Sequence, residues 1–336
     1  MKKKPVSDAA VDQSSLRSRV IAKLSEEVPE GDVKSFFSRD GRLALLTDAA
    51  DSNDCSNEVY VDFSPSSPLR SPLEIYVGRR RVVAGTWRTD VWANGQKLDA
   101  TGSWQTLCEE IDGDGAFVER LLPLSGGRSL SRRLFVANKE KIFLNVDVLY
   151  GSDAERNSTA EAPLLKIRST FPLDSTETNA KSADATDEVA FYDAASTLPF
   201  ARVFSLSNVK RRLNASDGTL AAKTTYGGSL ETATCRRGGS VCAATLFDWN
   251  ANRATRPVNV GVATVGENLR SVDEDCAVGR QIQLGRERYV LYVSTSRRPA
   301  IRSILSRNLL SDFMFGKFFV GRGVEPLVDV EAPTDF

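Results

Sequence analysis

The sequence predicts an all-β protein, a large, supersandwich-like antiparallel β-sandwich with a short helix near each terminus. Apolar and polar side chains alternate in runs such as Val59–Phe63 and Ile142–Val148, the period of half-buried strands. Turn-forming pairs such as Asn94-Gly95 and Gly126-Gly127 recur at short intervals. No long helical segments separate the runs, as the crossovers of a parallel sheet would require.

Residues 1–38 are predicted to form a polar tail that carries one amphipathic helix. Leu16, Val20, Ile21 and Leu24 fall on one face at helical spacing. A Pro-Glu-Gly sequence follows and would end the helix. We expect this helix to dock on the sandwich.

The sandwich domain is predicted to span residues 39–296. Two stretches rich in Ser, Thr, Ala, Asp and Glu interrupt its rhythm, Gly151–Pro163 and Asp174–Asp187. They flank one predicted strand, Leu164–Phe171, so they fit long loops within one sheet system. A domain boundary at 151–163 is the alternative.

Residues 297–336 are predicted to form a C-terminal helix and an extended tail packed on the sandwich. The helix would cover Pro299–Phe315, with Gly316 as its C-cap. Its apolar face would carry the following residues: Ile301, Ile304, Leu305, Leu309 and Leu310.

Composition excludes several kinds of chemistry. The chain has no histidine, so Ser-His-Asp triads, His-ligated zinc and the two-His iron site are excluded. The motif Asp112-Gly113-Asp114-Gly115 resembles half of a calcium loop, but a tight hairpin between Trp104–Ile111 and Ala116–Leu122 explains it better. We therefore expect no cofactor and no metal.

Charge and targeting signals point to a cytoplasmic protein. The 44 basic and 44 acidic residues cancel, which predicts no nucleic-acid partner and no anionic membrane partner. The basic start at Met1–Lys4 lacks the apolar region of a signal peptide, and no segment is long and apolar enough to cross a bilayer. Five cysteines are too few for a secreted disulfide scaffold.

Two of the cysteines, Cys235 and Cys242, lie on either side of a predicted turn. If Gly238-Gly239 formed a two-residue hairpin turn, Cys235 would face Cys242 within disulfide range. A reducing compartment favours two packed thiols, and a disulfide is the alternative.

Arginine clusters and tryptophans suggest a ligand surface. Guanidinium groups match carboxylates and sulfates, and indole rings can stack on sugar faces, so an acidic carbohydrate is the predicted partner. On the residues alone the favoured interpretation is that the arginines protect edge strands from aggregation and that the aromatics are core, and the ligand surface is the alternative to it. The candidate ligand-binding residues are Arg79, Arg81, Trp87, Trp92, Trp104, Arg132 and Arg133.

The favoured function is thus a non-catalytic, carbohydrate-associated or scaffolding domain. A second hypothesis is a histidine-free carbohydrate enzyme, either a lyase with a Tyr base or a glycosidase with paired carboxylates. The possible bases are Tyr76, Tyr192, Tyr226 and Tyr292, and the possible carboxylates are Glu109, Glu119, Asp273 and Asp275. A third is a module that binds a protein partner or a second copy of itself through a terminal helix or a strand edge. No motif selects a catalytic residue.

The region Trp104–Tyr150 resembles a known family. Phe117-Val118-Glu119-Arg120, then Ser129–Phe135 with its Arg132-Arg133 pair, then Phe143–Asp147, are similar to the β-sandwich region of heparinase II/III-like proteins. Phe315–Phe318 and Pro326-Leu327 share this character. The resemblance implies a sandwich fold and polysaccharide chemistry. The family's helical toroid and its histidine have no counterpart here, so no catalytic residue is carried over.

Overall fold

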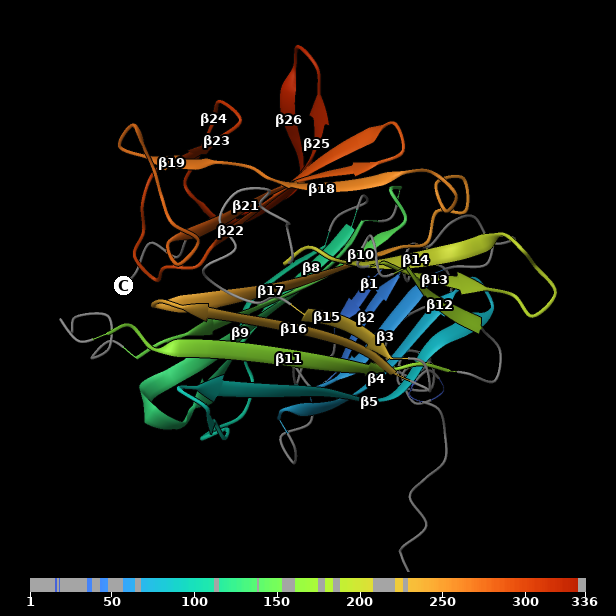
Figure 1. Cartoon of the computed structure of the whole chain (residues 1–336), viewed down its shortest axis with the longest axis horizontal. Helices are drawn as coiled ribbons and strands as arrows, with labels where there is room; N and C mark the ends of the chain where they lie inside the picture. The colour runs from blue at the N-terminus through green and yellow to red at the C-terminus, as the bar shows by residue number, and fades with distance from the viewer. Residues whose placement is uncertain are drawn as a thin grey trace, which may run out of the picture.

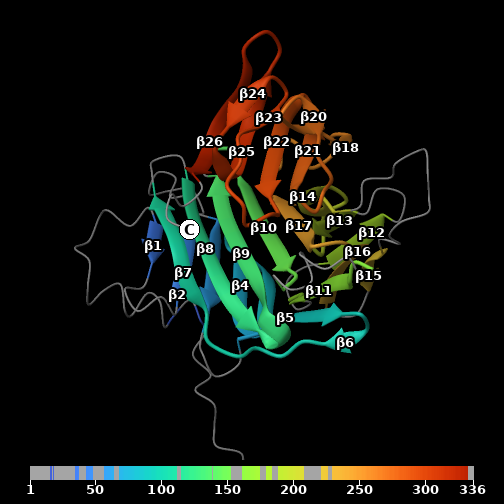
Figure 2. The same cartoon turned by 90° about the vertical axis from the view of Figure 1, so that its left-hand side faces the viewer.

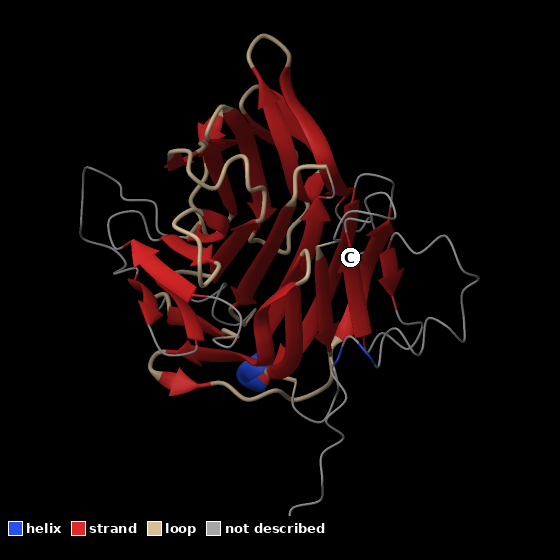
Figure 3. Ribbon diagram, turned by 90° about the vertical axis from the view of Figure 1, so that its right-hand side faces the viewer, coloured by secondary structure: helices blue, strands red, loops and turns tan. Residues whose placement is uncertain are grey.

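The computed structural model confirms an all-β chain built from antiparallel sheets (Figures 1 and 3). One 3-10 turn, η1 (Ser125–Gly127), interrupts the strands. The structure describes residues 57–63, 68–111, 115–137, 139–152, 161–174, 179–183, 188–207, 221–225 and 229–331, with Leu16, Ser18, 35–37 and 43–47.

Two large sheets form the base of the molecule. Sheet A has the order β1-β2-β3-β4-β5-β11-β16-β15, with β6 paired to β5, and sheet B has the order β12-β13-β14-β17-β10-β9-β8-β7. The strands of sheet A are β1 (Ser35–Phe37), β2 (Leu43–Thr47), β3 (Glu58–Asp62), β4 (Arg70–Val77), β5 (Arg80–Ala93), β6 (Gln96–Lys97), β11 (Leu164–Pro172), β15 (Ala221–Thr225) and β16 (Ser229–Arg237). Those of sheet B are β7 (Gln105–Ile111), β8 (Gly115–Leu124), β9 (Arg128–Ala137), β10 (Ile142–Tyr150), β12 (Asn179–Ala183), β13 (Glu188–Tyr192), β14 (Pro199–Ser205) and β17 (Ser240–Asp248).

Two smaller sheets complete the stack: sheet C packs on sheet B, and sheet D packs on sheet C. Sheet C has the order β18-β21-β22-β25-β26, and sheet D has the order β20-β19-β23-β24. The strands of sheet C are β18 (Val258–Val262), β21 (Ala277–Leu284), β22 (Glu287–Ser294), β25 (Ser311–Phe319) and β26 (Gly323–Glu331). Those of sheet D are β19 (Val265–Glu267), β20 (Arg270–Ser271), β23 (Arg302–Ile304) and β24 (Arg307–Leu309).

The four sheets stack in the order A, B, C, D, as Figure 2 shows from the side. One apolar core, with Val91 of β5 and Leu134 of β9, lies between A and B. A second core, with Phe135 of β9 and Tyr289 of β22, lies between B and C, and a third lies between C and D. The central strands of sheet B are therefore buried on both faces, and every residue of β10 is buried.

Arg132 and Arg133 place one guanidinium in each of the two cores that flank sheet B. Successive side chains of a strand point to opposite faces, so neighbours on β9 enter different cores. Arg132 faces sheet A and is 1% exposed. Its Nε and Nη2 donate to the two carboxylate oxygens of Asp147 at 2.8 and 3.0 Å, and Nη2 also donates to Thr89 Oγ1 at 2.6 Å.

Arg133 faces sheet C and is also buried. Its Nε donates to Glu119 Oε1 at 2.9 Å, and Nη1 donates to the main-chain oxygen of Asp312 at 3.3 Å. Ser131 donates to the same Glu119 oxygen at 2.7 Å. Both arginines thus have the paired, hydrogen-bonded surroundings that a buried charge requires.

Several local predictions are confirmed. The hairpin around the acidic turn pairs Ile111 with Ala116, and the strand predicted at Leu164–Phe171 is β11. Asn94 and Gly95 both have positive φ and turn the chain from β5 to β6. The residues Asp112–Asp114 lie outside the described part of the chain.

The predicted C-terminal helix is wrong, because strands β23, β24 and the start of β25 occupy its range. Ile304 and Leu309 are buried between sheets C and D, whereas Ile301 and Leu310 are more than 60% exposed. The chain reverses direction at Leu305, between β23 and β24, so only some of the apolar residues assigned to the helix face point into the core. The apolar spacing that fits one helical face also fits a short hairpin.

The hairpin that would place Cys235 opposite Cys242 does not form, so the alternative of a disulfide is wrong and the favoured prediction of two unbonded thiols is confirmed. β16 pairs with β11 and β15 in sheet A, whereas β17 pairs with β10 and β14 in sheet B. The Gly238-Gly239 turn therefore carries the chain from one layer to the next, and both cysteines are free thiols. Likewise, the polar stretch 174–187 contains a strand, β12, at the edge of sheet B.

The predicted N-terminal helix lies almost wholly outside the described residues. Leu16 and Ser18 are helical, and the Leu16 amide donates to Glu74 Oε1 at 3.2 Å. Leu16 is 4% exposed, so this point of the segment docks on sheet A.

The pair of Arg132 and Asp147 predicts a sharp contrast between single and double substitutions. Asp147→Asn should cost about 3–5 kcal/mol in the free energy of unfolding, because it leaves a buried guanidinium without a counter-charge. Replacing both residues with leucine should cost less. Chemical denaturation measures both values. Glu161→Gln, at the exposed ion pair with Arg237, is the control and should cost under about 1 kcal/mol. Equal losses for Asp147→Asn and Glu161→Gln would contradict this account.

Candidate functional site

The structure separates the predicted ligand-binding residues rather than gathering them. Trp87, Trp104 and Arg132 come together, but in the core between sheets A and B. The Arg132 guanidinium lies 3.5 Å from the Trp87 ring centroid and 5.2 Å from that of Trp104. Trp87 is 0% exposed, so these side chains support the sheets and offer no surface to a ligand.

The other predicted arginines lie at different places. Arg133 is in the core between sheets B and C, as described above. Arg79 is exposed in the turn between β4 and β5. Arg81 follows it and is half-buried, and its Nε donates to Asp174 Oδ2 at 2.6 Å.

Trp92 is the predicted aromatic residue that lies on an outward face. It is half-buried near the end of β5 and belongs to the face of sheet A that points away from sheet B. β11 runs beside β5 and places Lys166 opposite Trp92. Lys166 Nζ lies 5.1 Å from the Trp92 ring centroid, and the Arg168 guanidinium carbon lies 5.0 Å from it. The ring therefore sits beside two cations from the neighbouring strand.

A buried carboxylate, Asp90, binds one of these two cations, Arg168, together with two further cations on the same face. Asp90, 3% exposed, accepts from Arg88 Nη2 at 3.1 Å and from Arg168 Nη2 at 3.0 Å, and it forms an ion pair with Lys97 Nζ at 2.7 Å. The three cationic side chains are 32–47% exposed, so they keep access to solvent. We call this surface the basic strip: Arg88, Asp90, Trp92, Lys97, Lys166 and Arg168.

The electrostatics of the basic strip favour an anionic ligand. Burial alone would raise the pKa of Asp90, but hydrogen bonds from Lys97, Arg168 and Arg88 outweigh it and lower the pKa to about 2. One carboxylate is thus shared among three cations, and Lys166 adds a fourth. This surplus of positive charge beside an aromatic plane suits a sulfated or carboxylated sugar.

Strand alternation explains why these residues share one face. In β5 the odd positions, such as Trp87 and Val91, enter the core, so the even positions point outward. β11 behaves in the same way, with Leu165 and Ile167 inward. Sequence reasoning found Trp92 but missed its five companions. The alternation of charged residues in each strand was a visible signal, whereas the pairing of β5 with β11 was not.

The tyrosines considered as bases have unfavourable surroundings. Burial, followed by the nearby Glu74 carboxylate, raises the pKa of Tyr76 to about 12. Burial also raises the pKa of Tyr292, which is 0% exposed. A tyrosine base needs a lowered pKa to work near neutral pH, so neither residue supports the lyase hypothesis. Tyr226 lies outside the described residues.

Two of the carboxylates considered for hydrolysis, Glu109 and Glu119, are engaged in ion pairs. Glu119 is 6% exposed and bound to Arg133, and Glu109 lies in an ion pair with Arg120 at 3.3 Å. Within the described ranges, no three acidic or cysteine side chains gather in a way that would hold a metal ion. Over the same ranges, no helix has the length and apolarity that crossing a membrane requires.

Comparison with known proteins finds the fold among polysaccharide lyases. No family model matches the chain, and no curated protein matches it by sequence. The heparan sulfate lyase HepC of Pedobacter heparinus matches with a TM-score of 0.52 and 12% identity, over 84% of this chain and 46% of that one. A heparinase III structure matches with a TM-score of 0.51 and 14% identity, over 80% of this chain and 43% of that one.

These matches confirm the structural resemblance to the heparinase sandwich that the sequence indicated. At this level of identity the likeness establishes a shared fold. The chain spans less than half the length of the matched structures.

The lowered pKa of Asp90 predicts a specific acid dependence of stability. As pH falls from about 4 towards 2, the unfolded chain takes up the Asp90 proton before the folded chain does, so the contribution of Asp90 is lost in this window. Above it the contribution is complete. The stability difference between the wild type and Asp90→Asn should therefore shrink as pH falls through this range, measured by urea denaturation at fixed pH. Asp99→Asn, at an exposed aspartate, is the control. A difference that stays constant from pH 5 to pH 2 would contradict the assignment.

Proposed function

We propose that the protein is a carbohydrate-associated β-sandwich protein that binds acidic glycans through the basic strip without acting on them. The observation that carries the proposal is the placement of Lys166 and Arg168 beside the Trp92 ring on an outward sheet face. A sulfate or carboxylate would meet the two cations while the apolar face of a sugar ring packs on the indole. The cytoplasmic location stays a prediction.

Two features support this ligand class over others. First, guanidinium and ammonium groups are held in place by a buried carboxylate, so little side-chain entropy is lost when a ligand binds. Second, the fold is shared with proteins named heparan sulfate lyase and heparinase, whose names refer to sulfated glycans. Of the candidate residues from the sequence, Trp92 carries this proposal, because Trp87, Trp104, Arg132 and Arg133 are buried.

The proposal predicts that Lys166→Ala/Arg168→Ala weakens binding to heparin oligosaccharides. Loss of two charge-assisted contacts should cost about 2 kcal/mol, roughly a thirtyfold rise in Kd, measured by calorimetry. The slope of log affinity against log salt should fall by about two, as for other polyanions. The charge-matched control is Arg270→Ala/Arg322→Ala, at two exposed arginines, one in β20 and one in the turn between β25 and β26. If the control variant lost as much heparin affinity, the effect would be due to the change in net charge and not to the basic strip.

We expect substitution of the Trp92 indole to affect the salt dependence of binding differently from substitution of the cations. Trp92→Ala should weaken binding to the same oligosaccharides by about tenfold, because it removes a stacking surface and the ring beside both cations. It removes no charge, so the salt slope should stay the same. Calorimetry at three salt concentrations separates the two effects. Wild-type affinity in this variant would exclude the ring from the ligand site.

A further inference from the structure

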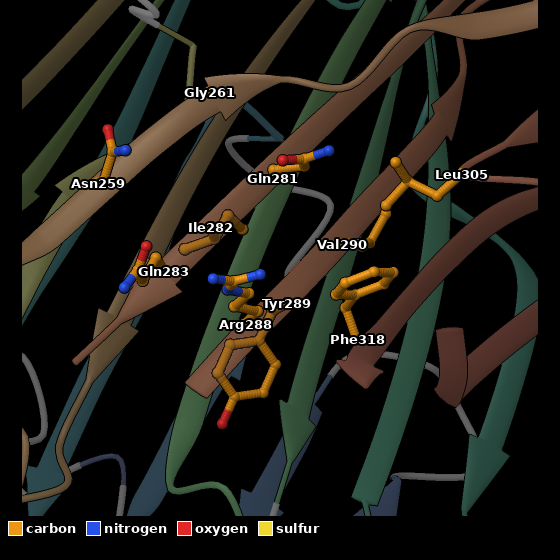
Figure 4. Close-up of a pocket in the computed structure, with 10 residues that line it drawn as sticks. All are labelled: Asn259, Gly261, Gln281, Ile282, Gln283, Arg288, Tyr289, Val290, Leu305 and Phe318. Carbon is orange, nitrogen blue, oxygen red and sulfur yellow. The ribbon is translucent and has the colours of Figure 1, made fainter. Parts of the chain in front are cut away.

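A second surface with ligand-binding character lies on sheet C, at the other side of the stack. A pocket of about 300 Å³ opens on the face of sheet C that points away from sheet B (Figure 4). Its lining includes Asn259, Gly261, Gln281, Gln283, Arg288 and Phe318. We call this pocket the furrow.

Polar side chains cross the furrow in one row. In the strand register Asn259 lies opposite Gln283, and Gln283 lies opposite Arg288. Tyr289 pairs with Lys317, which brings Phe318 next to Arg288 in the adjacent strand. Two amides, a guanidinium and an aromatic ring therefore follow one another across four strands. Cross-strand neighbours lie about 5 Å apart, so the row is long enough for several sugar units.

The polar side chains of this row make few hydrogen bonds or ion pairs with the rest of the described residues. Gln283 Nε2 donates to the Gly285 main-chain oxygen at 3.0 Å, which orients this amide. Within the described part of the chain, Arg288 makes no ion pair with a carboxylate. This contrasts with the many buried arginines of the molecule, which are matched to Asp or Glu.

The next row leaves room for a ligand. Gly261, Gln281, Val290 and Gly316 lie opposite one another in four neighbouring strands. Gly316 is required by packing, because a Cβ there would lie 2.7 Å from the Glu325 main-chain oxygen. A Cβ on Gly261 would meet nothing within 4 Å. Glycine weakens a strand, so one that packing does not need fits a place where a ligand comes close to the main chain.

A strained turn forms one wall. Leu305 and Ser306 turn the chain from β23 to β24 with φ of 47° and 65°, a left-handed conformation that favours glycine or asparagine. Leu305 packs partly against the core between sheets C and D and lines the furrow. Strain of this kind persists where the surrounding structure fixes it, and it is frequent at ligand sites.

We propose that the furrow binds a short oligosaccharide that carries a carboxylate, with Asn259, Gln281 and Gln283 on sugar hydroxyls and Arg288 on the carboxylate. The main-chain groups of β21 and β22 are used by pairing on both sides, so recognition on these strands falls to side chains, whereas β18 is the edge strand of the sheet. An amide both donates and accepts, which matches vicinal hydroxyls. The Arg288 fork matches a carboxylate, and the Phe318 ring offers an apolar plane. This site is separate from the basic strip and does not depend on the proposed function.

The test is calorimetric titration of the full chain with hexamers of galacturonate, mannuronate and glucuronate-containing units, each beside its carboxyl-reduced neutral form. At least one uronate hexamer should bind. Arg288→Gln should weaken its binding tenfold or more and change the neutral form by less than twofold. Gln283→Ala should weaken both forms by threefold or more, because hydroxyls are common to them.

Matched variants separate the furrow from the basic strip. Arg322→Gln and Gln96→Ala remove the same groups at exposed positions elsewhere and should leave uronate binding unchanged. The Lys166→Ala/Arg168→Ala variant should bind heparin more weakly than the wild type. Adding Arg288→Gln to this variant should weaken uronate binding by the same factor as in the wild type. The proposal is overturned if no hexamer binds, or if Arg288→Gln and Gln283→Ala bind like the wild type. Either failure leaves the heparin result on the basic strip standing.

Discussion

Sheet B lies between two other sheets, and the rest of the structure depends on this constraint. A sheet covered on both faces must be apolar on both, and any charge in it must find its partner inside. The chain meets this requirement with Arg132 bound to Asp147 on one side and Arg133 bound to Glu119 on the other. Both partners come from neighbouring strands of the same sheet. The ion pairs therefore link strands within sheet B and also reach the layers above and below it.

Burial of the inner sheets confines ligand chemistry to the outward faces. On sheet A the outward face carries the basic strip, whose cations are gathered by Asp90. Sheet D covers part of the face of sheet C that points away from sheet B, and the furrow lies beside it, where amides and Arg288 face solvent. The two surfaces differ in character, because one is dominated by positive charge and the other by hydrogen-bonding amides. The layered fold thus offers two independent surfaces on one rigid support.

Much of the fold follows from local sequence signals. Period-two runs located β3 and β10, and turn chemistry located the hairpins at Asn94-Gly95 and Ile111–Ala116. These signals depend on residues close in sequence. The chain crossing at Gly238-Gly239 was mispredicted because a tight turn between two strands has the same local sequence whether they share a sheet or belong to two.

The candidate site required information that local patterns lack. Two consecutive arginines such as Arg132 and Arg133 are typical of an exposed surface. Here they are buried and stabilise the fold, because β9 is covered by another sheet on each face. Conversely, Trp92 belongs to the candidate site because β11, more than seventy residues later, brings Lys166 and Arg168 beside it. Alternation assigns a residue to a face, but strand order decides whether that face meets another sheet or the solvent. For this chain, the number of layers was the missing fact, and it determines which arginines can reach a ligand.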